Sequence, residues 1–188
     1  CVAAKIQNSR QVLLRGAREA GSEADAATLA TAAAHLAEQL TDLHECRDLD
    51  TVRGIEGEAA RWYFAVFSHL LRAQRAEFAL AGRSRRPPRD RANSLLSFLY
   101  ALLRSECASA LEGVGLDPQV GYLHALRPGR PALALDLMEE LRPVVADRLA
   151  LTLINRRQLK ADNFEQSPGG AYHLTDEGRR AVVTAYQE

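Results

Sequence analysis

Hydrophobic residues recur at helical spacing along most of the chain, and this pattern predicts a mainly α protein. The spacing is i, i+3, i+4 and i+7, which places apolar side chains on one face of a helix. Helices are predicted over residues 3–15, 22–44, 50–71, 92–112, 132–141 and 143–157. The first is expected to stop near Gly16, and Ser22 is expected to cap the second. Residues 163–165 and 172–174 flank Ser-Pro-Gly-Gly and predict a small hairpin, after which Thr175 caps a last helix.

Prolines and glycines divide these helices. The pair Pro87-Pro88 cannot continue a helix, so residues 81–90 are predicted to form an exposed basic loop. Residues 115–131 contain five glycines and prolines in GLDPQV and LRPGRP alone and predict a long irregular segment that carries His124. Pro143 can begin a helix, so the chain is expected to bend where it follows the helix of residues 132–141. The fold class is therefore a single helical domain of about six to eight helices with a C-terminal β-hairpin.

Length and composition limit the protein to one domain. The chain is 47% hydrophobic, which suffices for one core, and its 188 residues are too few for two domains of ordinary size. No apolar stretch approaches the roughly 18 residues of a membrane span. The three cysteines are an odd number without a C-x-x-C pair, so neither disulfides nor a cysteine zinc site is expected, and a reducing prokaryotic cytoplasm fits best. The chain begins with Cys1 and its single methionine is Met138, so we expect an N-terminal portion to be missing.

Basic residues are clustered, although 24 Lys and Arg balance 24 Asp and Glu. The segment GRSRRPPRDR, at residues 82–91, contains five arginines and one aspartate. Such clustering is typical of a positive track for a phosphate-bearing partner, but taken alone it fits a solvated arginine loop better.

Glu56 is the first candidate for chemistry. It lies beside the predicted buried face of its helix and between Gly54 and Gly57, each of which costs a helix about 1 kcal/mol relative to alanine. Close approach of another backbone or of DNA would explain these glycines, and so would simple close packing of two helices. A charged residue bordering an apolar stripe is ordinary, so Glu56 needs partners to be functional.

Asp136, Glu139 and His124 are the candidate partners. The two acids are three residues apart on a predicted helix, so both carboxylates can reach one cation. Their neighbours are leucines and Met138, so at least one acid should be partly desolvated unless something compensates its charge, and a divalent metal would do so. Three carboxylates and one imidazole suit Mn²⁺ or Mg²⁺ better than structural zinc, and phosphoryl transfer uses such sites. Alternatively, Asp136 and Glu139 form an ordinary pattern on a helix surface, and His124 is a surface residue of its loop. The sequence has no phosphate loop, dinucleotide fingerprint, G-x-S-x-G elbow or H-E-x-x-H helix.

Several motifs together resemble one known family. They are VAAKIQNSRQVLLR, RGIEGEAARWYF, DRANSLLSFLYALL after the arginine loop, GYLHALRPGRPALALDLMEELRP and LALTLINRRQ. In this order and spacing the chain resembles the integrase-nuclease of CRISPR adaptation, the first of the numbered CRISPR-associated proteins. The likeness covers almost the whole chain and is greatest to the type I-C branch or to the nuclease-fused forms. Family members carry an N-terminal β-sandwich that this sequence lacks, so residues 1–188 are expected to be the helical catalytic domain.

The resemblance implies a site and an activity. The family's metal ligands fall on Glu56, His124 and Glu139, with Asp136 as a supporting acid and Mn²⁺ or Mg²⁺ as the cofactor. The third ligand is usually aspartate in the family, and Glu139 reaches one methylene further. The implied reaction is attack by a DNA 3′-hydroxyl on a phosphodiester of the CRISPR repeat, which inserts a prespacer into the array. Water as the nucleophile would make the same site an endonuclease.

The resemblance also implies DNA contacts and partners. Arg53 and Arg142 would hold phosphates beside the metal. Tyr100 matches a family tyrosine near the active site, and the alternative is a core tyrosine whose hydroxyl is hydrogen-bonded. The DNA track would be formed by four loop arginines that contact the DNA backbone rather than the bases, namely Arg83, Arg85, Arg86 and Arg89. Expected partners are a second copy of the chain, a small ferredoxin-like CRISPR-associated subunit and a Cas nuclease.

Two alternatives remain at this point. The chain could be a helical DNA-binding or assembly module that is not catalytically competent. It could also be a structural bundle in which the acids pair with arginines on neighbouring turns, namely Arg53, Arg61 or Arg142.

Overall fold

The computed structural model describes residues 1–188 and confirms a mainly helical fold with a small hairpin. The main helices are α1 (Val2–Arg18), α2 (Glu23–Glu45), α3 (Leu49–Ala65), α5 (Arg91–Gly113), α6 (Ala132–Leu141), α7 (Arg148–Asn155) and α8 (Asp176–Gln187). Shorter turns are η1 (Phe67–Leu70), α4 (Arg75–Phe78), η2 (Arg142–Asp147) and η3 (Ala161–Asn163). The hairpin is antiparallel and joins β1 (Phe164–Gln166) to β2 (Tyr172–Leu174), with Phe164 opposite Leu174.

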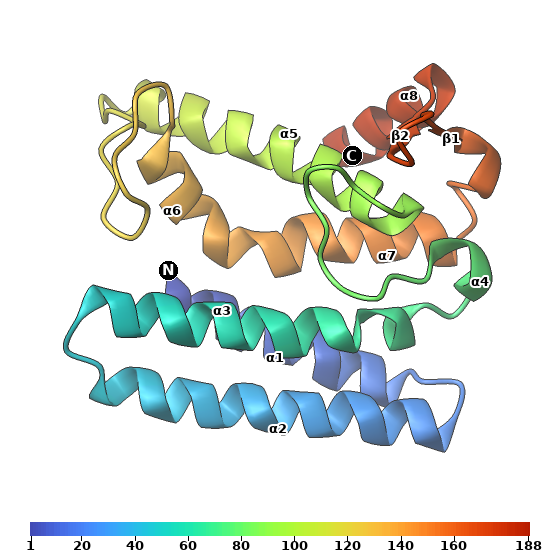
Figure 1. The fold of residues 1–188 in the computed structure, drawn as a ribbon, viewed down its shortest axis with the longest axis horizontal. Coiled ribbons are helices and arrows are strands. Elements are labelled where there is room, and N and C mark those ends of the chain that lie inside the picture. The colour runs from blue at the N-terminus through green and yellow to red at the C-terminus, as the bar shows by residue number, and fades with distance from the viewer.

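The helices form two groups that meet along α1 (Figure 1). The α1, α2 and α3 helices form one group, and α5, α6 and α7 form the other, with the hairpin and α8 at one end. Helix α1 contacts α2 and α3 on one side and α6 and η2 on the other. One continuous apolar core joins the groups and includes the fully buried Leu13, Leu29, Leu36, Leu95 and Leu99. None of the helices is both long enough and apolar enough to cross a bilayer.

Both predicted helix caps are confirmed. The Ser22 hydroxyl accepts a hydrogen bond from the Asp25 amide at 3.1 Å, and Thr175 caps α8 through the Gly178 amide at 3.1 Å. The predicted end near Gly16 is wrong, because α1 continues to Arg18. A Cβ at Gly16 would overlap the side chain of Leu70, so this glycine lets η1 pack closely on α1 and does not end the helix.

The third helix is shorter than predicted. Helix α3 ends at Ala65, and the chain turns through η1 instead of continuing to Leu71. The side chain of Asn155 holds this turn, because it accepts from the Arg72 amide at 2.7 Å and donates to the Leu70 carbonyl at 3.2 Å. A bond from a residue 83 positions away is a tertiary effect that local periodicity does not contain.

The predicted bend at Pro143 is present, and its form is a π turn. The helical path runs from α6 through η2 into α7 and changes direction there (Figure 1). Proline lacks an N–H and crowds the preceding turn, which a wider turn accommodates. Both Arg142 and Asp147 of η2 are buried as a result.

Candidate active site

Three separate elements bring Glu56, His124 and Glu139 together. Glu56 lies on α3, His124 on the loop before α6, and Glu139 on α6. The His124 Nε2 atom is 3.6 Å from Glu139 Oε1. The Lys5 ammonium lies between the two acids, in contact with Glu56 Oε1 and 2.6 Å from Glu139 Oε2. The candidate residues of the sequence therefore converge on one place, with a lysine among them.

Lys5 is a site residue that sequence analysis missed. It lies on the buried stripe of α1 with Ile6, Ser9 and Val12, and only 11% of its side chain is exposed. A lysine on an apolar stripe requires a buried countercharge, and this was the available signal. The charges of Lys5 and Arg142 outweigh the effect of burial and hold the pKa of Glu139 below its usual value.

Asp136 organises the loop that carries His124. Its carboxylate accepts the backbone N–H groups of Tyr122, Leu123 and His124 at 2.6, 2.9 and 3.0 Å. It also lies 2.6 Å from His124 Nδ1. Burial alone would raise the pKa of Asp136, but these hydrogen bonds outweigh it and the pKa is lowered. An ionised carboxylate only accepts, so His124 Nδ1 donates to Asp136, and Nε2 is on the side of the ring that faces Glu139.

The two arginines beside the site are held by protein groups. Arg53 donates from Nε and one terminal nitrogen to the Leu123 carbonyl at 2.9 and 2.7 Å, and it pairs with Asp50. Arg142 lies 2.6 Å from Glu139 Oε1, so the alternative of ion pairing along the helix holds for this pair. Arg53 thus fixes the loop, and Arg142 fixes the Glu139 carboxylate.

Tyr100 lies beneath the site and contacts a buried acid. Its hydroxyl donates to Asp147 Oδ1 at 2.7 Å, and the guanidiniums of Arg83 and Arg142 each lie 5.1 Å from its ring centre. Burial raises the pKa of Asp147 to about 6, although the hydroxyl of Tyr100 and the nearby arginines partly oppose it. Asp147 is not among the residues that the sequence singled out. Its place on the inner side of the π turn makes it part of the site's support.

The arginine loop is exposed at three of the four predicted positions. Arg85, Arg86 and Arg89 are exposed. Arg83 differs, because its guanidinium donates to Asn93 Oδ1 at 2.7 Å and to Ser97 Oγ at 3.1 Å and packs on Tyr100. The expectation of a fully exposed loop is therefore wrong at Arg83, which anchors the loop to α5.

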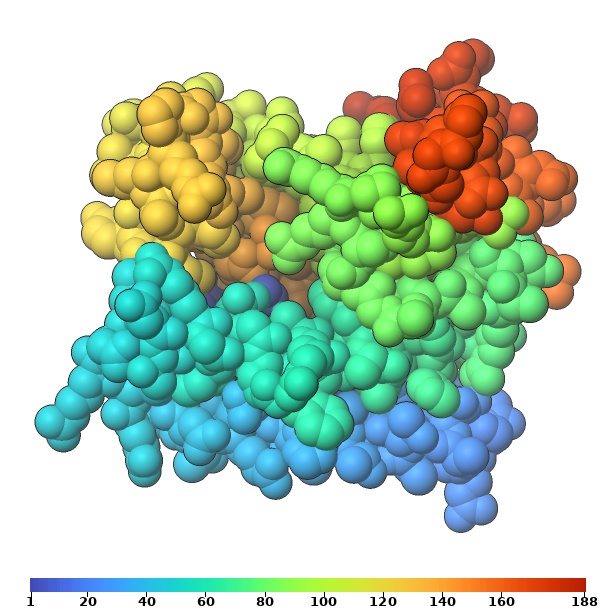
Figure 2. Space-filling view, viewed as in Figure 1, coloured from blue at the N-terminus to red at the C-terminus, as the bar shows by residue number.

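The site opens into a hollow between α3 and this loop. The hollow has a volume of about 410 Å³ and is lined by Glu56, Gly57, Arg61 and Arg85 among others. Figure 2 shows this face hollowed between the two helix groups, with the dark blue start of α1 visible within. Arg61 pairs with Glu58 and not with a candidate ligand.

Neither explanation of the helical glycines is found within the chain itself. Gly54 and Gly57 are exposed, and no atom lies within 4 Å of a Cβ built at either position. Close helix packing at these two positions is therefore wrong as a reason for them. Space is left for a molecule outside the chain.

The residues fit a divalent cation once Lys5 moves aside. No group of three or more His, Cys, Asp and Glu side chains already has metal-binding geometry. The buried Glu139 is compensated in this structure by Lys5 and Arg142, which occupy the role that the sequence analysis gave to a metal. Yet two carboxylates share one ammonium, and Glu139 Oε2 has no partner with hydrogen-bond geometry. Two carboxylates and an imidazole with a fixed Nδ1 are a donor set that Mn²⁺ and Mg²⁺ accept.

Comparison with known proteins decides the family. The family model described as CRISPR associated protein Cas1 matches residues 1–188. The chain belongs to the Cas1 family. It is 57% identical to CRISPR-associated endonuclease Cas1 1 of Moorella thermoacetica, over 100% of this chain and 54% of that protein. It is also 41% identical to a Cas4/Cas1 fusion of Geobacter sulfurreducens, over 99% of this chain and 33% of the fusion.

Solved structures of Cas1 relatives share the fold. A structure titled Cas6-RT-Cas1–Cas2 complex superposes with a TM-score of 0.86 at 30% identity, over 99% of this chain and 20% of that one. A casposase bound to integration product superposes with a TM-score of 0.81 at 26% identity, over 99% and 50%. The chain spans about half the length of the first curated Cas1 relatives that it matches.

Proposed function

We propose that this chain is the helical catalytic domain of a Cas1 integrase, a metal-dependent enzyme that joins prespacer DNA to a CRISPR repeat. The observation that carries the proposal is that Glu56 and Glu139 share one cation, the Lys5 ammonium, while His124, oriented by Asp136, lies with Nε2 3.6 Å from Glu139 Oε1. Endonuclease activity is the same chemistry with water as the nucleophile. The names of the Cas1 relatives support this reading.

Glu56, His124 and Glu139 would hold Mn²⁺ or Mg²⁺. The ion supplies a lowered pKa for the attacking 3′-hydroxyl or water and stabilises charge on the reacting phosphate. Asp136 would keep the proton on His124 Nδ1, so that Nε2 can bind the metal through its lone pair. Arg142 restrains the Glu139 carboxylate through Oε1.

The DNA would enter through the hollow beside α3. Arg85 lies at its edge next to Glu56, and Arg85, Arg86 and Arg104 line an adjoining hollow of about 240 Å³. These exposed guanidiniums suit backbone phosphates and carry no base specificity. The proposed partners are prespacer and repeat DNA, a second copy of the chain, the small ferredoxin-like subunit and a Cas nuclease. Titles of related structures that name Cas1–Cas2 assembly and an integration product support the first and third.

Calorimetric titration with Mn²⁺ tests the proposal directly. The intact chain is expected to bind Mn²⁺ saturably, and His124→Ala and Glu56→Gln are expected to lower the affinity at least about tenfold. His173→Ala, at an exposed histidine on β2, is the control and should bind as the wild type does. Strand transfer on branched DNA should fail in the same two variants.

One observation favours a second candidate function. Lys5 and Arg142 already oppose the charges of Glu56 and Glu139, so the fold does not require a metal to compensate these acids. If the folded chain binds no Mn²⁺, the catalytic proposal fails and a helical DNA-binding or assembly module takes its place.

The exposed Gly57 on α3 predicts opposite effects of one substitution on stability and on strand transfer. Gly57→Ala should raise the free energy of unfolding by about 1 kcal/mol, because alanine is the better helix former and its methyl group meets open space. The same methyl group should lower strand transfer, because it stands where DNA would approach Glu56. Urea unfolding and the strand-transfer assay measure the two effects. Gly113→Ala, at another exposed helical glycine, should leave strand transfer unchanged.

Asp147 predicts a pH dependence of stability. Its pKa is about 6 in the folded chain and 3.8 in the reference state, so between these values the folded chain keeps a proton that the unfolded chain releases. This group therefore stabilises the fold less as pH rises through 6, by on the order of 3 kcal/mol. The stability of Asp147→Asn relative to wild type should rise by that order between pH 4 and 7, in urea unfolding at a series of pH values. Parallel wild-type and variant curves would contradict it.

A further inference from the structure

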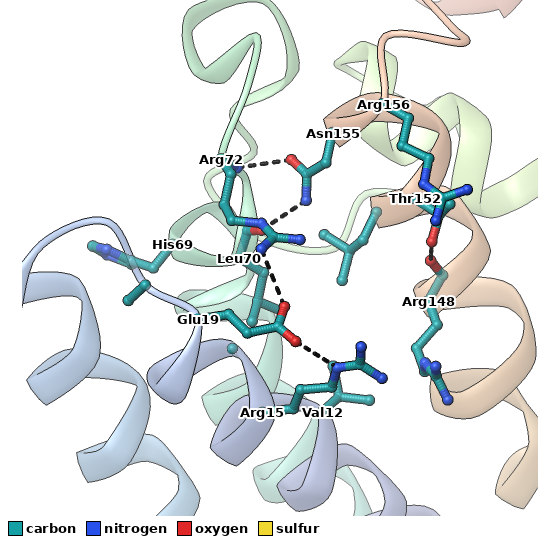
Figure 3. A pocket seen from close by; sticks show the side chains of 13 residues that line it. Val12, Arg15, Glu19, His69, Leu70, Arg72, Arg148, Thr152, Asn155 and Arg156 are labelled. Atoms are coloured by element: carbon teal, nitrogen blue, oxygen red, sulfur yellow. Dashed lines mark hydrogen bonds and ion pairs between the residues drawn. The ribbon is translucent and has the colours of Figure 1, made fainter.

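A second basic hollow lies at the other end of α1 from the candidate active site. It has a volume of about 180 Å³ and is walled by the end of α1, the segment after η1, and α7 (Figure 3). Its charged lining consists of Arg15, Glu19, His69, Arg72, Arg148 and Arg156. Four guanidiniums thus face one carboxylate, so the hollow carries a net positive charge.

The single acid of this hollow is already neutralised. Glu19 lies 2.8 Å from Arg15 and 3.2 Å from Arg72, and Figure 3 shows it between the two. The hydrogen bond from Arg15 lowers the pKa of Glu19, so it stays ionised and holds both arginines in place. His69 Nδ1 lies 2.6 Å from Asp25 Oδ1 and so is engaged with a residue outside the hollow.

The arginines of α7 have no such partner. No ion pair or side-chain hydrogen bond within the chain involves the guanidinium of Arg148 or Arg156, and both side chains are exposed at the hollow. They stand with Thr152 on the wall opposite the Arg15–Glu19–Arg72 chain (Figure 3).

The wall that carries these arginines is hydrogen-bonded to its neighbour. Asn155, between them on α7, bonds the Arg72 amide, the Ala73 amide and the Leu70 carbonyl, which ties α7 to the segment after η1. Gly16 allows Leu70 to pack against α1 on the remaining side. The three walls are therefore joined before any ligand arrives, so binding there would need little reorganisation.

We propose that this hollow is a second phosphate-binding site, formed by Arg148 and Arg156 with Arg15 and Arg72. Guanidinium forks bind phosphate oxygens in pairs, and a small concave hollow suits one phosphate better than an extended acidic peptide. The source we favour is the backbone of DNA bound at the candidate active site. That choice rests on the proposed function.

The spacing along α1 is compatible with this source. Lys5 and Gly16 lie on the same face of α1 and are separated by about 16 Å, at 1.5 Å per residue. This equals about five base pairs along a duplex. A short duplex that reaches the candidate ligands therefore has further phosphates at this distance.

DNA binding in EDTA tests the site separately from the metal. The double variant Arg148→Ala/Arg156→Ala is compared with Arg179→Ala/Arg180→Ala, which removes the same charge from exposed positions on α8. Fluorescence anisotropy with a labelled branched duplex is measured over a range of salt concentrations. The pocket variant should lose at least about tenfold in affinity, and its salt slope should decrease by about 2. The α8 variant should lose much less.

Titration with inorganic phosphate distinguishes the source. Loss of DNA affinity in the pocket variant alone supports a DNA backbone site, and loss of inorganic phosphate binding alone supports a site for a free phosphate compound. If both double variants behave alike with both probes, the proposal is overturned, and an acidic protein segment becomes the candidate occupant. Unchanged Mn²⁺ binding by the pocket variant shows that a DNA defect does not arise at the metal site. Failure of Mn²⁺ binding by the wild type is a separate result that bears on the catalytic proposal alone.

Discussion

Lys5→Met is expected to lower the free energy of unfolding by about 3 kcal/mol in EDTA and to make the fold depend on Mn²⁺. The ammonium is the cation that Glu56 and Glu139 share, and Glu139 is nearly fully buried. Without it, two carboxylates face each other with only Arg142 to oppose them. Mn²⁺ should restore much of the loss, because it would bind the folded state without competition from the lysine.

Urea unfolding with and without excess Mn²⁺ measures this effect. Lys160→Met is a matched control, because Lys160 is the only other lysine of the chain and its side chain is exposed. The control should lose little stability and should gain from Mn²⁺ only what the wild type gains. If Lys5→Met gains no more from Mn²⁺ than the control does, Lys5 does not occupy the place of a metal.

The second large effect is expected at Asp136. Asp136→Ala should lower the free energy of unfolding by about 3 kcal/mol, because it removes the acceptor for three backbone N–H groups, one of them on the buried Leu123. It should also lower Mn²⁺ affinity about 10- to 100-fold, because His124 loses the partner that orients its ring. Urea unfolding and calorimetry measure the two losses.

A loop acid elsewhere provides the control for Asp136. Asp117→Ala removes a carboxylate from the same connection, but Asp117 accepts only the Gln119 amide at 2.8 Å and is exposed. We expect it to change Mn²⁺ affinity little. Wild-type affinity in Asp136→Ala would show that His124 is not oriented through this carboxylate, even if the variant is less stable.

These two residues would hold the site together before a metal binds. Asp136 fixes the imidazole and Lys5 neutralises the acids, so both tasks that a metal would perform for the fold are done by the chain. A metal would then compete with Lys5 and would not nucleate folding. Folding and Mn²⁺ binding can therefore be measured separately. A folded chain that binds Mn²⁺ supports the catalytic domain, and a folded chain that does not supports the assembly module.

The sequence by itself determined the helical class, most element positions and the identity of the candidate ligands. Periodicity locates helices because each buries one face, and the two predicted caps act through residues three positions away. The motifs around Glu56, His124 and Glu139 are local in sequence and carry the Cas1 resemblance, which the family match confirms. Their roles as ligands remain predictions.

The tertiary structure decided what surrounds these residues. The sequence did not show that Lys5 lies between Glu56 and Glu139, because the contact joins positions 51 residues apart. Arg83 was predicted to be exposed with the rest of its loop, yet Asn93 and Tyr100 bind it at the start of α5. The physical reason is common to these cases: a charged side chain can be solvated or buried in a pair, and only the packing of distant helices decides between the two.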